Sequence, residues 1–221
     1  MADQVSLFLH EVVDIVGEGA KPYMDLMVRT NTDSIADRGM HLFGTFQVVG
    51  MTGRWPQVIN LWRIDGWEGW RRSLVAANIK REENKALKEW WDDAYRHRSG
   101  GFDRLLQATT VTPTGGELFV HEISKVKAGA GPDYLAALES DWAPVAAEHG
   151  HTLVGAFEVL FTDVEVVTVW ATSLDDHIAF ESGHDDRVAG WRSRAREFVT
   201  HWREELMVPG PGSPLSPVTD R

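Results

Sequence analysis

The sequence predicts an α+β protein built from two tandem copies of one β-α-β-β-α-β unit. The first observation is a repeated segment, since residues 7–11 (LFLHE) recur at an offset of 111 as residues 118–122 (LFVHE). The second is that this offset persists, because residues 39–48 (GMHLFGTFQV) align without a gap with GHTLVGAFEV at 150–159. A self-similarity of this length indicates two related structural units of roughly a hundred residues.

The first predicted unit covers residues 1–112. Its hydrophobic periodicity predicts, in order, a strand over 5–16, a helix over 20–37, strands over 41–50 and 56–64, a helical region over 67–98, a short helix over 102–106 and a strand over 107–112. Glycines at positions 17, 39 and 100 fall at the expected boundaries of these elements, where a chain break is favoured.

The second predicted unit covers residues 117–208 and follows a linker, PTGG, at 113–116. The expected elements are strands over 117–126, 151–161, 165–172 and 206–208, with helices over 133–148 and 174–204. The segment 209–221 is rich in proline and glycine, which predicts a disordered tail.

A β-α-β-β-α-β order is the ferredoxin-like plan, in which both helices cover one face of a four-stranded sheet. The other face needs a partner, because an apolar sheet face left in water is unstable. Two copies in one chain can cover each other. We therefore expect the two bare faces to close into a barrel-like sandwich around a central cavity.

Composition restricts the function. The chain has 221 residues and a net charge of -11 at pH 7, so nucleic acid and anionic membrane surfaces are unfavourable partners. It has no cysteine, which excludes disulfides, zinc–thiolate sites and a cysteine nucleophile. No apolar run is long enough for a membrane helix, and the first residues do not resemble a signal peptide. We expect a soluble, cytoplasmic protein, and a homo-oligomer is compatible with the sequence.

Comparing the two halves predicts which side chains line the cavity. Positions that are apolar in both copies are expected to face the helices, for example Phe46 with Phe157 and Leu61 with Val169. The alternate positions are then expected to face the cavity and bind substrate: Phe8, Phe43, Gln47, Asn60 and Trp62 in the first half, with Phe119, Thr168 and Trp170 in the second. Such a mostly apolar cavity suits a hydrophobic small molecule with one or two polar groups.

Three residues on the expected cavity faces can carry acid–base chemistry, namely His10, His121 and Glu158. Histidine titrates near neutral pH, and burial raises the pKa of a glutamate, so both suit proton transfer. We predict these three as catalytic residues, with structural roles in the strands as the alternative.

The run GTFQVVG at 44–50, followed by VINLWRID at 58–65 and by Arg71-Arg72, resembles the NIPSNAP family of the dimeric α/β-barrel superfamily. Asn60 stands where that family has a histidine. The resemblance implies an intramolecular dimeric α/β-barrel. It also implies one of the activities found in the superfamily, which includes cofactor-independent monooxygenases, cyclases, isomerases and lyases, as well as haem enzymes resembling chlorite dismutase and aldoxime dehydratase.

The leading hypothesis is a small-molecule enzyme that binds an apolar substrate between the two sheets and works without a cofactor. Isomerase, lyase, cyclase and cofactor-independent monooxygenase activities all fit acid–base chemistry in such a cavity. A haem enzyme with His177 or His184 as the axial ligand is the alternative, and a non-catalytic ligand-binding protein is a third. The run His184-Asp185-Asp186 could hold a metal ion, although an exposed acidic helix start explains it better.

Overall fold

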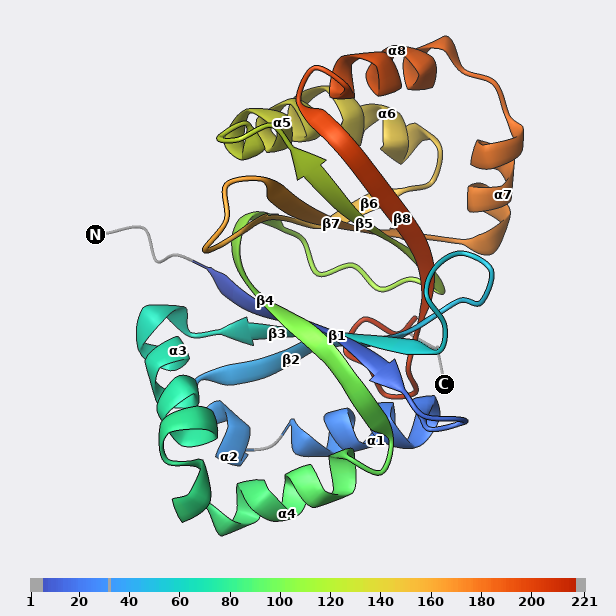
Figure 1. Cartoon of the computed structure of the whole chain (residues 1–221). Coiled ribbons are helices and arrows are strands. Elements are labelled where there is room, and N and C mark those ends of the chain that lie inside the picture. The colour runs from blue at the N-terminus through green and yellow to red at the C-terminus, as the bar shows by residue number, and fades with distance from the viewer. Residues whose placement is uncertain (1–5, 32, 218–221) are drawn as a thin grey trace. The chain divides into compact units, whose positions relative to one another are not determined.

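The computed structural model describes residues 6–31 and 33–217 and divides the chain into two compact units (Figure 1). Unit 1 comprises the described residues up to Leu105 together with Pro209–Ser216, and unit 2 comprises Leu106–Val208 with Pro217. These boundaries differ from the predicted one at residue 112, because the last strand of the first repeat continues into unit 2. Residue 5 of the first predicted strand and residues 218–221 of the predicted tail lie outside the described residues.

Unit 1 has the predicted order of strands and helices. Its elements are β1 (Leu7–Ile15), α1 (Ala20–Thr30), α2 (Asp33–Ala36), β2 (Met40–Val48), β3 (Gln57–Ile64), α3 (Gly66–Leu74), a π-helical turn (Val75–Ile79), a 3-10 turn (Arg81–Glu83), α4 (Lys85–Ala94) and the first part of β4 (Arg98–Val111). Figure 1 shows α1, α2 and α4 on the same side of the strands of this unit.

Unit 2 repeats this order. Its elements are the second part of β4, β5 (Leu118–Val126), α5 (Gly131–Ala137), a π-helical turn (Leu138–Trp142), α6 (Ala143–Glu148), β6 (Thr152–Val159), β7 (Glu165–Thr172), α7 (Leu174–Ser182), α8 (Asp186–Ala195) and β8 (Val199–Pro209). Over the residues that the structure describes, no helix combines the length and the apolar character needed to cross a bilayer.

The register of unit 1 defines the two faces of its sheet. Strands β1 and β2 both pair antiparallel with β3, which places Glu11, Asn60 and Thr45 opposite one another and hence on one face. Helix α1 covers this face, because it contacts β2 and β3 and its Tyr23 lies close enough to Glu11 for the carboxylate to raise the pKa of the tyrosine, after burial as the larger cause. The face away from the helices is apolar and buried, and it carries Phe8, Val12, Phe46, Ile59 and Leu61.

Unit 2 has the same arrangement. Strand β7 pairs antiparallel with β5 and β6, β8 pairs with β5, and the second part of β4 pairs with β6. Glu122, Thr168 and Ala156 share the helix-covered face, where Val166 and Trp170 join a core with Tyr134 of α5. The predicted α+β class with tandem ferredoxin-like units is therefore confirmed.

The face assignment predicted for the third strand of each unit, and for the second strand beyond the irregularity in its pairing, was wrong, whereas Phe43 lies away from the helices as predicted. Phe46 and Leu61 lie away from the helices, whereas Gln47, Asn60, Trp62, Thr168, Trp170 and Glu158 lie on the helix-covered face. Both faces are buried, so apolar character shared by the two halves does not mark the helix side. The assignment for the first strand agrees with the structure, since Phe8 and His10 lie on the face of the sheet opposite to Glu11.

The last strand of each unit is longer than predicted. Strand β4 begins at Arg98 and includes residues 102–106, where we expected a short helix, and β8 begins at Val199, inside the helical region expected over 174–204. Both stretches are rich in charged residues, which conceals the period of two that marks a strand. As a result Asp103 and Glu204 project from sheets.

The segment 209–217 is ordered, contrary to the predicted disordered tail. Within unit 1 the Gly210 N–H donates to the Thr45 carbonyl oxygen at 2.9 Å, and the Ser213 hydroxyl accepts from the Thr45 N–H at 3.0 Å. Leu215 is 4% exposed. These hydrogen bonds satisfy backbone groups of β2, and they offset the conformational entropy that the segment loses when it becomes ordered.

Candidate functional site

Each unit carries a glutamate on the helix-covered side of its first strand. In unit 1, Glu11 accepts a hydrogen bond from the indole of Trp62 at 2.9 Å. In unit 2, Glu122 accepts one from the indole of Trp170 at 2.8 Å and another from the hydroxyl of Thr168. These residues occupy equivalent positions of the repeat. The same carboxylate–indole pair is thus present twice in one chain.

A second carboxylate comes from the last strand of each unit. Glu204 of β8 lies directly opposite Glu122 of β5, and Asp103 of β4 is close enough to Glu11 to raise its pKa further, after burial as the larger cause. The pKa of Asp103 is also raised by burial. Two carboxylates this close resist carrying two negative charges.

Glu204 has the pKa best placed for proton transfer. The residue as a whole is exposed at the pocket rim, yet surrounding protein displaces much of the water from its carboxylate. This desolvation, followed by the charges of Glu122 and Glu181, raises the pKa of Glu204 to about 7. Remaining solvent contact moderates the effect without changing its direction. The carboxylate therefore exchanges a proton near neutral pH.

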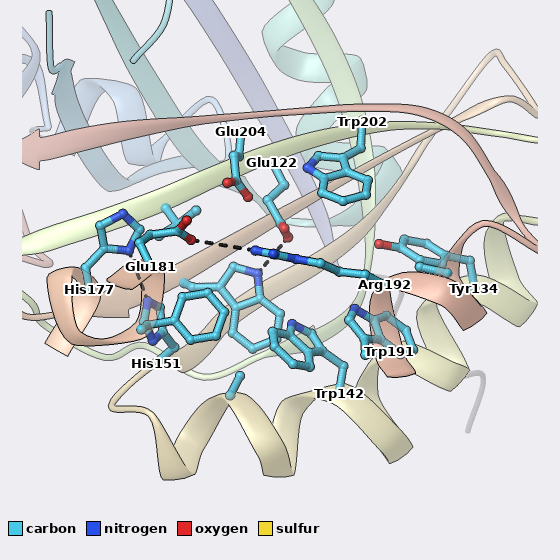
Figure 2. A pocket seen from close by; sticks show the side chains of 15 residues that line it. Glu122, Tyr134, Trp142, His151, His177, Glu181, Trp191, Arg192, Trp202 and Glu204 are labelled. Atoms are coloured by element: carbon cyan, nitrogen blue, oxygen red, sulfur yellow. Dashed lines mark hydrogen bonds and ion pairs between the residues drawn. The ribbon is translucent and has the colours of Figure 1, made fainter. Parts of the chain in front are cut away.

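The two unit 2 carboxylates open into a pocket between the sheet and the helices (Figure 2). Its volume is about 60 Å³, which is small beside the ~300 Å³ of a typical ligand site. It is lined by Val120, Glu122, Tyr134, Trp142, Ala146, His151, Trp170, His177, Phe180, Glu181, Trp191, Arg192, Ala195, Trp202 and Glu204. A compact head group, rather than a large ligand, matches this space.

Stacked aromatic rings form the wall opposite the carboxylates (Figure 2). The rings of Trp142 and Trp191 are parallel within 5°, with centroids 5.9 Å apart. Tyr134 stacks on the other side of Trp191 at 6.1 Å, and Phe180 lies 6.1 Å from Trp142. Flat π-faces of this kind favour planar or cationic ligands.

Two helices with capped N-termini, α7 and α8, carry the pocket residues Glu181 and Arg192. Helix α7 begins after Ser173, whose hydroxyl accepts from the Asp176 N–H at 3.0 Å. Helix α8 begins after Asp185, whose carboxylate accepts from the Arg187 N–H at 2.7 Å. Each cap satisfies a backbone donor that the first helical turn leaves unpaired, so the start of each helix is fixed.

Glu181 of α7 and Arg192 of α8 meet at the mouth of the pocket. Their side chains form an ion pair at 3.8 Å and are 46% and 45% exposed. Figure 2 shows Arg192 reaching across the pocket toward Glu181, between the carboxylates and the aromatic wall. Such an exposed pair is weak and can be displaced by a ligand.

Two histidines complete one end of the pocket. His151 Nε2 lies 3.3 Å from His177 Nδ1, and His151 Nδ1 lies 2.9 Å from the His149 carbonyl oxygen. Burial lowers the pKa of His151, so this ring favours its neutral form. The histidine pair is therefore a hydrogen-bonded wall beside the carboxylates.

The structure does not bring the three predicted catalytic residues together. His10 and His121 are buried on the faces away from the helices, and His121 Nδ1 lies 3.1 Å from Glu205 Oε1. Glu158 lies on the helix-covered face, opposite Val166. The predicted set therefore spans both faces of the sheet, so these residues cannot act as one acid–base group. A catalytic role for any one of them stays a prediction.

The predicted substrate-binding residues also divide between the faces. Phe8, Phe43 and Phe119 lie away from the helices, with the rings of Phe8 and Phe43 5.3 Å apart. Of those on the helix-covered face (Gln47, Asn60, Trp62, Thr168 and Trp170), Trp170 lines the unit 2 pocket. Asn60, Trp62 and Thr168 instead donate hydrogen bonds to the buried glutamates.

The residues of this pocket do not fit a haem. An axial histidine needs a free ring nitrogen facing a cavity large enough for the porphyrin. His177 Nδ1 faces His151 in a cavity of about 60 Å³, and His184 is 87% exposed beside Asp186. Among the residues that the structure describes, no group of three or more carboxylate or imidazole side chains is arranged to hold a metal ion.

Comparisons with known proteins identify the fold. No protein family and no curated protein sequence matches the chain. Among solved structures, an anthrone oxidase-like protein has 13% identity over 99% of this chain and 98% of that chain, with a TM-score of 0.66. A proposed monooxygenase from Lactobacillus acidophilus has 10% identity over 93% and 94%, with a TM-score of 0.65. A mutant chlorite dismutase from Candidatus Nitrospira defluvii has 12% identity over 96% and 94%, with a TM-score of 0.54. At such low identity these similarities show the fold alone, which is that of a chain with two tandem ferredoxin-like units.

Proposed function

We propose that this protein is a small-molecule enzyme whose active site is the unit 2 pocket, with Glu204 as the general base. The observation that carries the proposal is the position of Glu204 opposite Glu122 in a pocket with an aromatic wall, where desolvation, followed by the charge of Glu122, raises the pKa of Glu204 to about 7. A base titrating near the working pH combines a useful ionised fraction with a useful driving force for proton removal. Glu122, fixed by Trp170 and Thr168, orients the substrate.

The reaction class that fits this site is oxygenation without a cofactor. Removing a proton from a one-ring hydroxyaromatic substrate gives a phenolate that can pass an electron to O2. For phenol, O2 supplies one oxygen atom to the ring carbon opposite the hydroxyl, which becomes a carbonyl of benzoquinone, and the other leaves as water with the hydrogens lost from that carbon and from the hydroxyl. The monooxygenase and oxidase names of the similar folds support this choice over isomerisation, cyclisation or lyase chemistry.

The base can be tested without knowing the substrate. Nitrobenzisoxazole is a small aromatic probe that opens to a coloured cyanophenolate when a base takes its ring C–H proton and the N–O bond breaks. We expect the protein to catalyse this opening with a rate that rises through about pH 7, and Glu204→Gln to lower it by roughly 100-fold. Glu197→Gln, on the loop before β8, is the matched control. Equal rates for the protein and for Glu204→Gln would refute the assignment.

The reaction class needs a separate measurement. With a one-ring phenol in an oxygen electrode, we expect uptake of one O2 for each quinone formed, without added metal or cofactor, and loss of this uptake in Glu204→Gln. Catalysed ring opening of nitrobenzisoxazole without oxygen uptake from one-ring phenols would retain the base and reject oxygenation.

Finer expectations from the sequence stay predictions. These are membership of the NIPSNAP family, an apolar substrate, absence of a cofactor, a cytoplasmic location and homo-oligomer formation. A non-catalytic ligand-binding protein is the alternative that the ring-opening assay distinguishes, since such a protein would bind the probe without accelerating the reaction.

A further inference from the structure

The unit 1 copy of the carboxylate site contains its own cation. The guanidinium of Arg98 lies 5.9 Å from the ring centroid of Tyr23 and 5.4 Å from that of Trp91, and it donates to the Tyr23 hydroxyl at 3.2 Å. Its charge also opposes the raised pKa of both Glu11 and Asp103. An internal guanidinium between two aromatic faces therefore balances the two carboxylates of unit 1.

Over the part of unit 2 that the structure describes, the last strand carries no arginine at the position equivalent to Arg98. At the offset of 101 that relates β4 and α4 to β8 and α8, Asp103 corresponds to Glu204, whereas Arg98 corresponds to Val199. The tyrosine is retained, because Tyr134 is the counterpart of Tyr23. Unit 2 keeps the carboxylates and the aromatic faces, but the residue at the sequence position of Arg98 is Val199, which is buried in the hydrophobic core.

Arg192 supplies one positive charge to this pocket. It stands at the position of Trp91 and reaches across from the exposed mouth to pair with Glu181 (Figure 2). Its charge also opposes the raised pKa of Glu204. Glu181 is itself an added acid, since the equivalent residue of unit 1 is Ser73 at the offset of 108. Among the lining residues three carboxylates thus face one guanidinium, so negative charge is in excess. Aromatic faces around such an excess favour a cation over an anion or a neutral group.

We infer that the ligand of the unit 2 pocket carries a positively charged nitrogen on or next to an aromatic ring, and that this nitrogen occupies the place that Arg98 fills in unit 1. The inference names the substrate class for the active site proposed above. The small volume of the pocket restricts the cationic head to a single ring or a substituted ammonium group. A positive charge also acidifies neighbouring C–H and O–H bonds, which suits removal of a proton by a carboxylate.

A matched series of one-ring compounds tests the charge requirement on the unmodified protein. Benzyltrimethylammonium, benzylammonium, benzyl alcohol and benzoate share the ring and differ in charge, and their binding can be measured by calorimetry and by tryptophan fluorescence. We expect both cations to bind about tenfold more tightly than benzyl alcohol, and benzoate not to bind. Equal or tighter binding of benzyl alcohol or benzoate would overturn the inference.

Proton linkage gives a second measurement on the same site. The groups facing Glu204 are Glu122 on β5, Glu181 on α7, Arg192 on α8 and Trp202 on β8, with His151 and His177 at the pocket end. Benzyltrimethylammonium keeps its charge at every pH, so its affinity should rise between about pH 6 and 8 as the carboxylate ionises. Glu204→Gln should flatten this rise. A flat profile in the unmodified protein would contradict the inferred ion pair.

Restoring the unit 1 pattern should close the site. Val199→Arg, combined with Arg192→Trp, places a guanidinium and an indole at the positions that Arg98 and Trp91 occupy in unit 1. We expect loss of benzyltrimethylammonium binding, whereas the neutral control Val199→Leu should retain preference for cations over benzyl alcohol. Because the ligand series uses the unmodified protein, a folding failure of the double variant leaves the inference testable. Cation binding without ring opening of nitrobenzisoxazole would reject the general base alone, and ring opening without cation preference would reject the ligand class alone.

Discussion

At the scale of single residues, the proposed chemistry depends on two carboxylates, Glu122 and Glu204, that line one small pocket. Glu122 is fixed by two donors, whereas Glu204 stands at the rim, where desolvation raises its pKa to about 7. Environment rather than residue type therefore separates the roles proposed for them, which are orientation of the substrate for Glu122 and proton removal for Glu204.

The raised pKa of Glu204 makes stability depend on pH. The folded protein keeps this proton up to about pH 7, whereas an unfolded glutamate releases it at about pH 4.3. Between these values the folded state binds more protons, so stability should fall as pH rises. Thermal unfolding between about pH 5 and 8 should show a larger decrease for the unmodified protein than for Glu204→Gln. Parallel curves would contradict the shift.

The hydroxyl that Thr168 donates to Glu122 can be removed without changing shape. Thr168→Val keeps the β-branched form and deletes the donor, so we expect a loss of about 1–2 kcal/mol in the free energy of unfolding and weaker ligand binding. Thr152→Val, at the exposed start of β6, is the control and should change neither quantity. Urea titration measures the difference, and identical midpoints for the two variants would dismiss this hydrogen bond as a contributor.

At the scale of elements, helices α7 and α8 form the mouth of the pocket, where they place Glu181 and Arg192. Ser173→Ala removes the acceptor at the start of α7 and should cost about 1 kcal/mol. It should also weaken binding of benzyltrimethylammonium, because α7 carries Glu181 and His177. Ser173→Asn supplies an equally good cap and should restore both values. Chemical denaturation measures the free energy of unfolding of the two variants, and calorimetry measures their affinity for benzyltrimethylammonium. Equal losses of stability and affinity in both variants would show that capping is not involved.

The strand lengths explain which site residues the sequence could reveal. Glu11 and Glu122 fell in strongly periodic strands that recur in both halves, so their position on the helix side was predictable. Glu204 lies in a run, HWREELM, whose charged residues resemble an exposed helix more than a strand. Arg192 and the aromatic wall come from helices, and sequence periodicity does not predict how these helices pack against one another. The repeat predicted the elements, but the choice of face required the pairing register.

At the scale of the whole molecule, the chain returns to unit 1 after completing unit 2. Deleting residues 210–221 should expose the backbone of Thr45, because Gly210 and Ser213 satisfy its carbonyl and N–H groups. We expect faster hydrogen exchange at the Thr45 amide and a lower melting temperature. Deleting only residues 218–221 leaves both contacts in place and should change neither measurement. Unaltered exchange at Thr45 in the longer deletion would show that the segment adds nothing to unit 1.

Strand β4 serves unit 1 with its first eight residues and unit 2 with its remainder, and residues 209–216 belong to unit 1. The boundary between the two sequence repeats therefore differs from the boundary between the two structural units. Cleaving the polypeptide at the PTGG junction would leave unit 2 without the part of β4 that pairs with β6, and unit 1 without residues 209–216. A chimaera that exchanges halves with a similar protein should therefore place its crossover inside β4 and keep the C-terminal segment with the first half.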